Sequence, residues 1–234
     1  MPTDPHPHPL VLPPPDETRS RPRYRRSVWT VVRVALLGTL VLLLPFVVLV
    51  RSAVYFYAHR GFAAWLAIGA ALGLSLALVS IYAAWASFRL TGRVHLRAAI
   101  RWVALPLVAL YGGYSLLYLS QMNAKGPEVL SYYRSLHPVL RVALSTLVVV
   151  DRHLVITDLR REPADYAALG LPAAEASLHY PQPDGYVHAL DLRTIGRSAW
   201  RNVLVAGYFR AMGFRTLRHV GTADHLHVAL PPPG

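Results

Sequence analysis

Three long apolar runs set the first limit on what this chain can fold into. They cover residues 30–50, 62–88 and 102–120, and Arg33 is the only charged residue within them. About 20 apolar residues are enough for a helix to cross a hydrocarbon core of about 30 Å. Because 54% of the 234 residues are hydrophobic and only 15% are charged, composition also favours a membrane protein. We therefore predict three transmembrane helices within residues 28–120.

Arginine residues flank these runs unevenly, which predicts their orientation. Six arginines lie between residues 19 and 33, two in the first loop and four in the second loop. Cytoplasmic loops carry the excess of Lys and Arg. The N-terminus and the second loop are thus predicted to be cytoplasmic, and the residues after 120 extracytoplasmic. We interpret the first run as a retained helix in the cytoplasmic membrane, because it lacks an obvious small-residue cleavage site and two further runs follow.

The net charge of +12 is the kind of value that can indicate a nucleic-acid partner. Here the positive charge flanks the apolar runs, and no acidic residue occurs between Thr18 and Pro127. The charge therefore indicates membrane topology, and we predict no nucleic-acid binding. Residues 1–27 are rich in Pro and Arg, which predicts a disordered cytoplasmic tail.

Residues 127–234 are numerous enough to form a domain with its own core. Helical and strand patterns are mixed there without strict alternation. This order predicts an α+β fold, with a small antiparallel sheet and flanking helices. The predicted helices are 127–135, 137–146, 162–169 and 196–212, and the predicted strands are 148–150, 153–158, 186–192, 215–220 and 225–230.

Histidine and aspartate residues in this domain form a candidate zinc site. The chain contains no cysteine, so a metal would be held by His, Asp or Glu. His225 and His227 are two positions apart on a predicted strand and should face the same side, one as a ligand and the other free for proton transfer. Asp191 lies on another predicted strand, and a loop rich in Pro and Gly can bring His179 beside it. Such a set can hold Zn²⁺ with one position open for water.

Other histidines fit this candidate site less well. His188 faces the opposite side of its strand from Asp191, so we predict a substrate-facing or structural role for it. His137, His153 and His219 are predicted to lie at the surface or behind the ligands.

A resemblance to a known family is carried by two stretches, Ser177-x-His179…Gly185-x-x-x-Ala189-x-Asp191-Leu192 and Asp224-His225-x-His227-Val228. They resemble the metallopeptidases grouped with lysostaphin, the D-alanyl-D-alanine peptidases and the Sonic hedgehog signalling domain. The usual pattern there is Ser-x-His-x-x-Gly-x-Ala-x-Asp, followed by Glu-x-x-His or His-x-His. The resemblance covers roughly residues 137–230. It departs from the family in spacing, because 12 positions separate His179 from Asp191 where the pattern has seven, and the family's acid/base Glu is not visible.

The resemblance implies roles for individual residues. It implies that His179, Asp191 and His227 bind zinc and that His225 assists catalysis. Arg161 falls at the family's arginine position, after a strand, and is assigned to the catalytic residues together with His225. Arg161 or Ser177 would help to hold the substrate or the metal cleft. We also assign His188 and Tyr186 to substrate binding.

The implied activity is hydrolysis of peptidoglycan stem peptides by a D,D-peptidase-like zinc enzyme anchored in the membrane, acting as a D-alanyl-type endopeptidase or carboxypeptidase. One alternative is an inactive module of the same hedgehog/DD-peptidase-like fold that binds a wall peptide or a protein partner. Another alternative is that the membrane helices carry the function and the C-terminal domain regulates them. The interiors of the apolar runs hold no acidic residue, which disfavours this alternative because functional intramembrane sites usually carry ionisable groups.

Overall fold

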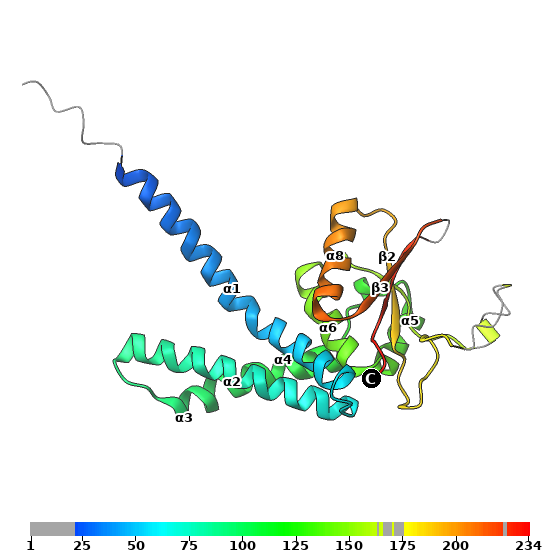
Figure 1. Cartoon of the computed structure of the whole chain (residues 1–234), viewed down its shortest axis with the longest axis horizontal. Helices are drawn as coiled ribbons and strands as arrows, with labels where there is room; N and C mark the ends of the chain where they lie inside the picture. Colours follow the sequence, from blue (N-terminus) through cyan, green and yellow to red (C-terminus); the bar gives the residue numbers. More distant parts are fainter. Residues whose placement is uncertain (1–21, 163, 166–169, 171–175, 222–223) are drawn as a thin grey trace, which may run out of the picture. The chain divides into compact units, whose positions relative to one another are not determined.

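The computed structural model describes residues 22–162, 164–165, 170, 176–221 and 224–234. Its elements are labelled in Figure 1. The chain divides into two compact units, residues 1–43 and 44–234. Most of the predicted tail and most of the predicted helix 162–169 lie outside the described residues.

Three helical stretches are long and apolar enough to cross a membrane: Val28–Ala58, Ala64–Thr91 and Leu96–Leu117. The first belongs to α1 (Pro22–Ala58), which begins within the segment predicted to be a disordered tail, and the second is α2 (Ala64–Thr91). The third runs through α3 (Leu96–Ala99), a π-helical stretch (Ile100–Ala104) and α4 (Leu105–Leu117). Pro106 accounts for the π-helical stretch, because proline has no N–H to donate and its ring crowds the preceding turn.

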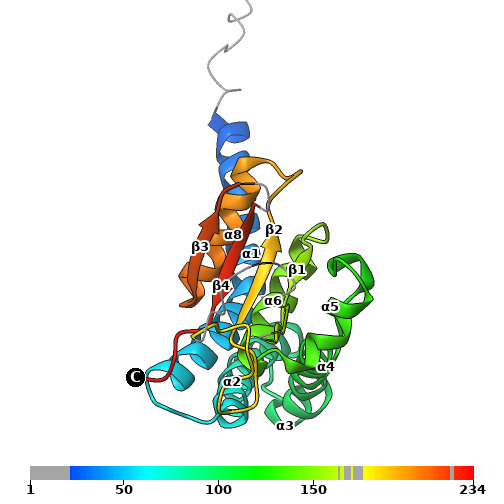
Figure 2. The same ribbon diagram turned by 90° about the vertical axis from the view of Figure 1, so that its right-hand side faces the viewer.

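Four antiparallel strands form one sheet in the order β1–β2–β4–β3. Figure 2 shows these strands side by side. The predicted α+β class with a small antiparallel sheet is thereby confirmed. The strands are β1 (Ile156–Asp158), β2 (Ala189–Arg193), β3 (Arg215–His219) and β4 (His225–Ala229).

Short helices surround this sheet. Gln121–Asn123 and Tyr132–Ser135 form 3₁₀ turns, and the α-helices are α5 (Pro127–Ser131), α6 (Pro138–Val150) and α8 (Ala199–Met212). Gly213 ends α8 in the left-handed conformation with φ 101°, which glycine adopts without steric cost.

The predicted strand at residues 148–150 is wrong, because α6 continues through them. Their β-branched side chains favour a strand locally. In the structure Val148 is buried in the core one turn after Leu144, so packing along the helix outweighs the local preference.

One hydrophobic core joins the helix ends to the sheet. It includes Leu49 and Val54 of α1, Leu140 and Leu144 of α6, and Val228 of β4. Polar contacts add to this packing near the end of α4. The Tyr133 hydroxyl donates a hydrogen bond to the carbonyl oxygen of Ser115 (2.6 Å), and Arg141 donates to that of Leu116 (2.7 Å). The sheet is thus held on a base made partly of the apolar helices.

Candidate metal centre

Three donor atoms converge on one side of the sheet: His179 Nε2, Asp191 Oδ1 and His227 Nδ1. The distances are 2.9 Å between His227 and Asp191, 3.2 Å between the two imidazoles, and 3.4 Å between His179 and Asp191. Tetrahedral zinc with ligands at about 2.0–2.1 Å places neighbouring donor atoms about 3.3 Å apart. The three side chains could therefore hold a metal ion, and their donor chemistry and spacing fit zinc.

Strand pairing positions two of these donors. Asp191 of β2 and His227 of β4 are directly opposite in the antiparallel register, where side chains of paired strands lie on the same face and in contact. The third donor comes from the loop before β2. Two backbone hydrogen bonds hold that loop, from the Arg161 N–H to the His179 carbonyl (3.0 Å) and from the His188 N–H to the Leu178 carbonyl (2.9 Å).

The groups behind the donors fix their orientation. His179 Nδ1 lies 2.8 Å from the carbonyl oxygen of Leu159, so it carries the proton and leaves Nε2 free to bind a metal. Asp191 presents Oδ1 to the two imidazoles, whereas its Oδ2 accepts a hydrogen bond from Arg161 Nη2 at 3.3 Å. Arg161 also donates through Nε to Asp158. The guanidinium therefore bridges two carboxylates and holds Asp191 in place.

Burial and charge act in opposite directions on two of the donors. Burial alone would raise the pKa of Asp191, but hydrogen bonds from His179 and His227 outweigh it and hold this pKa well below its usual range. Burial alone would lower the pKa of His179, but the hydrogen bond and the charge of Asp191 outweigh it and raise this pKa above 6.5. Asp191 is therefore ionised at neutral pH, as a metal ligand must be.

The raised pKa of His179 predicts how zinc and protons compete. The His179–Asp191 interaction stabilises the zinc-free fold fully below pH 6.5 and is lost as pH rises through the raised pKa. Zinc needs the neutral imidazole of His179, so its affinity should fall about tenfold per pH unit below that pKa. We expect the difference in melting temperature between zinc-loaded and chelated protein to grow from pH 6 to pH 9. A constant difference over this range would contradict the assignment of His179.

His225 lies beside the three donors, as its same-face position on β4 predicts. Its Nε2 atom is 3.6 Å from Asp191 Oδ2, and its side chain is 24% exposed, so it is accessible from solvent. The structure adds His219, which lies opposite His225 in the β3–β4 register and stacks on its ring at 4.7 Å. This pairing could have been predicted from the sequence, because a hairpin with its turn at Gly221 places residues 219 and 225 opposite each other.

Other predicted site residues make different contacts. The Ser177 hydroxyl accepts a hydrogen bond from the His179 backbone N–H at 3.3 Å, which orders the loop carrying His179. The Tyr186 hydroxyl accepts a hydrogen bond from the Trp65 indole at 2.9 Å. His188 Nε2 lies 2.9 Å from Asp184. The structure therefore groups Tyr186 and His188 away from Asp191, and the role of both in substrate binding stays a prediction.

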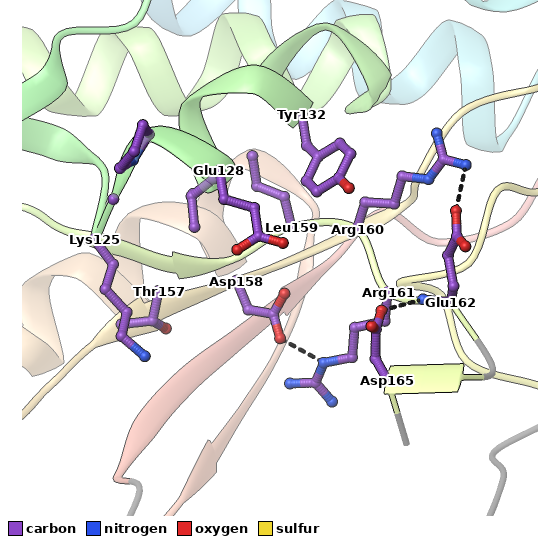
Figure 3. A pocket seen from close by; sticks show the side chains of 13 residues that line it. Lys125, Glu128, Tyr132, Thr157, Asp158, Leu159, Arg160, Arg161, Glu162 and Asp165 are labelled. Atoms are coloured by element: carbon purple, nitrogen blue, oxygen red, sulfur yellow. Dashed lines mark hydrogen bonds and ion pairs between the residues drawn. The ribbon is translucent and has the colours of Figure 1, made fainter. Parts of the chain in front are cut away.

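A cavity of about 520 Å³ adjoins the centre through Arg161, which is one of its lining residues. Figure 3 shows Glu128 and Asp158 among the side chains that line this cavity, with Arg161 paired to Asp158. Charges of both signs line this cavity, together with the ring of Tyr132. It is therefore suited to a ligand that carries polar groups of both signs.

Comparison of the chain with protein-family models, with curated proteins and with solved structures found no match. The fold and the site define an α+β unit in which a buried group of two histidines and an aspartate could hold a metal ion, joined to three helices able to cross a membrane.

Proposed function

We propose that this protein is a membrane-anchored zinc peptidase that hydrolyses peptidoglycan stem peptides, as a D-alanyl-type endopeptidase or carboxypeptidase. The observation that carries the proposal is the triangle of donor atoms from His179, Asp191 and His227. These are the same positions that the resemblance to the lysostaphin, D-alanyl-D-alanine peptidase and hedgehog group implies as zinc ligands. The spacing of 12 positions between His179 and Asp191 does not prevent their donors from meeting at 3.4 Å.

His179, Asp191 and His227 would hold the zinc ion. Zinc bound there would activate water and polarise a scissile carbonyl group. His225 is the group placed to move a proton, because its ring is accessible to solvent and lies 3.6 Å from Asp191. We assign it the transfer of a proton to the leaving amine. The stacked ring of His219 limits the rotation of His225 and keeps it facing the centre.

Arg161 and the adjoining cavity are the proposed substrate-holding parts. Arg161 positions Asp191 and also faces the cavity. A stem peptide carries free carboxylate and amine groups, which the mixed charges of the lining can pair. Lys125 and Arg160 offer positive charge, whereas Glu128 and Asp165 offer negative charge.

The charge distribution supports an extracytoplasmic site. With the predicted N-terminus inside, three crossings would put the sheet on the outer side of the cytoplasmic membrane. Peptidoglycan lies on that side, so the proposed substrate and the proposed site occupy the same compartment. Motif and topology are independent properties of the chain, and both favour a wall peptidase.

The test is a digest of purified peptidoglycan by the full-length protein in detergent micelles, analysed by mass spectrometry. We expect new peptide termini with zinc-loaded protein, their loss after complete removal of zinc by a chelator, and their return when zinc is restored. Binding of peptidoglycan without new termini would replace the proposal with the inactive wall-binding module. Cleavage that survives complete zinc removal would show that the centre is not catalytic.

A further inference from the structure

A second group of potential metal ligands lies outside the proposed catalytic centre. It consists of His137, directly before α6, Asp184, in the loop 181–186, and His188, directly before β2. His188 Nε2 lies 2.9 Å and 3.1 Å from the two carboxylate oxygens of Asp184. His137 Nε2 lies 3.6 Å from Asp184 Oδ2. The three donor atoms all lie within 4.8 Å of one another.

His137 is the unusual member of this group. Its side chain is 0% exposed, and among the described residues its Nε2 has no hydrogen-bond partner. Buried polar atoms almost always have a partner, so this atom, directed toward Asp184, requires an explanation. Burial lowers the pKa of His137 to about 3, so the ring is neutral and its approach to Asp184 is not an ion pair. The prediction that His137 lies at the surface or behind the zinc ligands is wrong, because this residue caps the N-terminus of α6 inside the core.

The surroundings of the group are suited to a cation. The Asp184 side chain is 33% exposed, which leaves an entry path from solvent and room for water to complete the coordination. The two histidines are held rigidly. The Tyr57 ring lies 4.4 Å from the His137 ring and 5.9 Å from the His188 ring, and backbone hydrogen bonds join His188 to Leu178 and Leu230.

One contact opposes metal binding at this group. His137 Nδ1 accepts a hydrogen bond from the Val139 N–H at 3.3 Å. Coordination through Nε2 moves the proton of the ring to Nδ1 and leaves that N–H without its acceptor. The loss of such a hydrogen bond weakens binding by about 5- to 150-fold. The group should therefore bind more weakly than the His179 centre, where the Nδ1 proton already faces a carbonyl oxygen.

We propose that His137, Asp184 and His188 form a second site for a divalent transition metal of the zinc class, with a structural role. Two imidazoles and one carboxylate suit such ions better than they suit Ca²⁺ or Mg²⁺. The bound ion ties the loop 181–186 to the start of α6. Asp184 and His188 lie within the stretch that makes the distance from His179 to Asp191 longer than in the resembling family. The extra length thus supplies ligands of its own.

The test counts zinc per chain by equilibrium dialysis of the full-length protein in detergent micelles over a series of free zinc concentrations. The parent carries His6→Ala and His8→Ala, which removes the two histidines near the N-terminus, and has no histidine tag. We expect two zinc ions per chain for the parent, one for Asp184→Asn and one for His227→Ala. The double variant should bind none, and His188→Gln should match Asp184→Asn.

These variants separate the two sites. Asp184→Asn is nearly isosteric and partly exposed, so its folding can be checked against the parent by circular dichroism. If Asp184→Asn and His188→Gln retain the parent's zinc count, the second site is overturned, whatever happens at His227. If His227→Ala retains the count while Asp184→Asn loses one zinc, the second site stands and the proposed catalytic centre fails. Cobalt(II) loading gives a readout independent of activity, because each occupied site adds its own visible absorption.

Discussion

Replacing His227 with alanine should abolish hydrolysis of peptidoglycan peptides, with a loss of at least about a thousandfold in rate. His227 supplies one of three protein donors, and its Nδ1 lies 2.9 Å from Asp191 and 3.2 Å from His179. Without it the centre has two donors, which is too few for a stable zinc site of this kind. The measurement is the rate of new peptide termini together with the zinc content of the variant.

His153→Ala is the matched control, because His153 is an exposed histidine of the same domain and is not part of either histidine group. It should retain the activity and the zinc content of the parent. Full activity in His227→Ala would exclude the centre as the site of hydrolysis. A variant that loses activity but keeps its zinc would show that His227 acts on the substrate and not on the metal.

Replacing Arg161 with alanine is expected to lower both zinc affinity and hydrolysis by about 10- to 100-fold. The guanidinium bridges Asp158 and the buried Asp191. Its removal leaves two neighbouring carboxylates without their shared cation and frees Asp191 to rotate away from the imidazoles. Arg161→Lys should retain only part of the parent's zinc affinity and hydrolysis rate, because an ammonium group lacks the planar fork of arginine.

The measurements for Arg161 are a zinc titration and a rate determination on the same preparation. Arg210→Ala is the control, since Arg210 is exposed on α8 and its guanidinium donates a hydrogen bond to the nearby Thr216. Parental zinc affinity in Arg161→Ala would show that the guanidinium does not position Asp191. Parental affinity combined with a reduced rate would assign Arg161 to the substrate alone.

Much of the group formed by His179, Asp191 and His227 could be predicted from the sequence, because alternation along a strand is a local rule. Alternation along a strand places His225 and His227 on one face, and the structure brings both against Asp191. The apolar runs and their flanking arginines predicted three spans, and three helices of suitable length and composition are present. Local sequence patterns are sufficient where the repeat of a strand or helix decides which side chains lie on the same face.

The second histidine group could not be predicted in the same way. His137 is 47 positions from Asp184, and nothing in the local pattern indicates that the start of a helix and the tip of a loop will meet. The same limitation explains the error at residues 148–150, where packing around α6 overrides β-branched side chains. Contacts between distant segments depend on how the whole core assembles, which no short window of sequence contains.

The hydrophobic core shared by α1 and the sheet limits which fragments of this protein can be prepared. Leu49, Val50 and Val54 of α1 are buried together with Leu140 and Leu230, so the underside of the sheet-bearing part is completed by residues from the apolar helices. A fragment starting near residue 121 would expose to water the apolar surface that these α1 residues cover. Fragment boundaries should therefore be drawn no later than residue 44, where the larger compact unit begins, and biochemistry should be done with detergent or lipid from the outset.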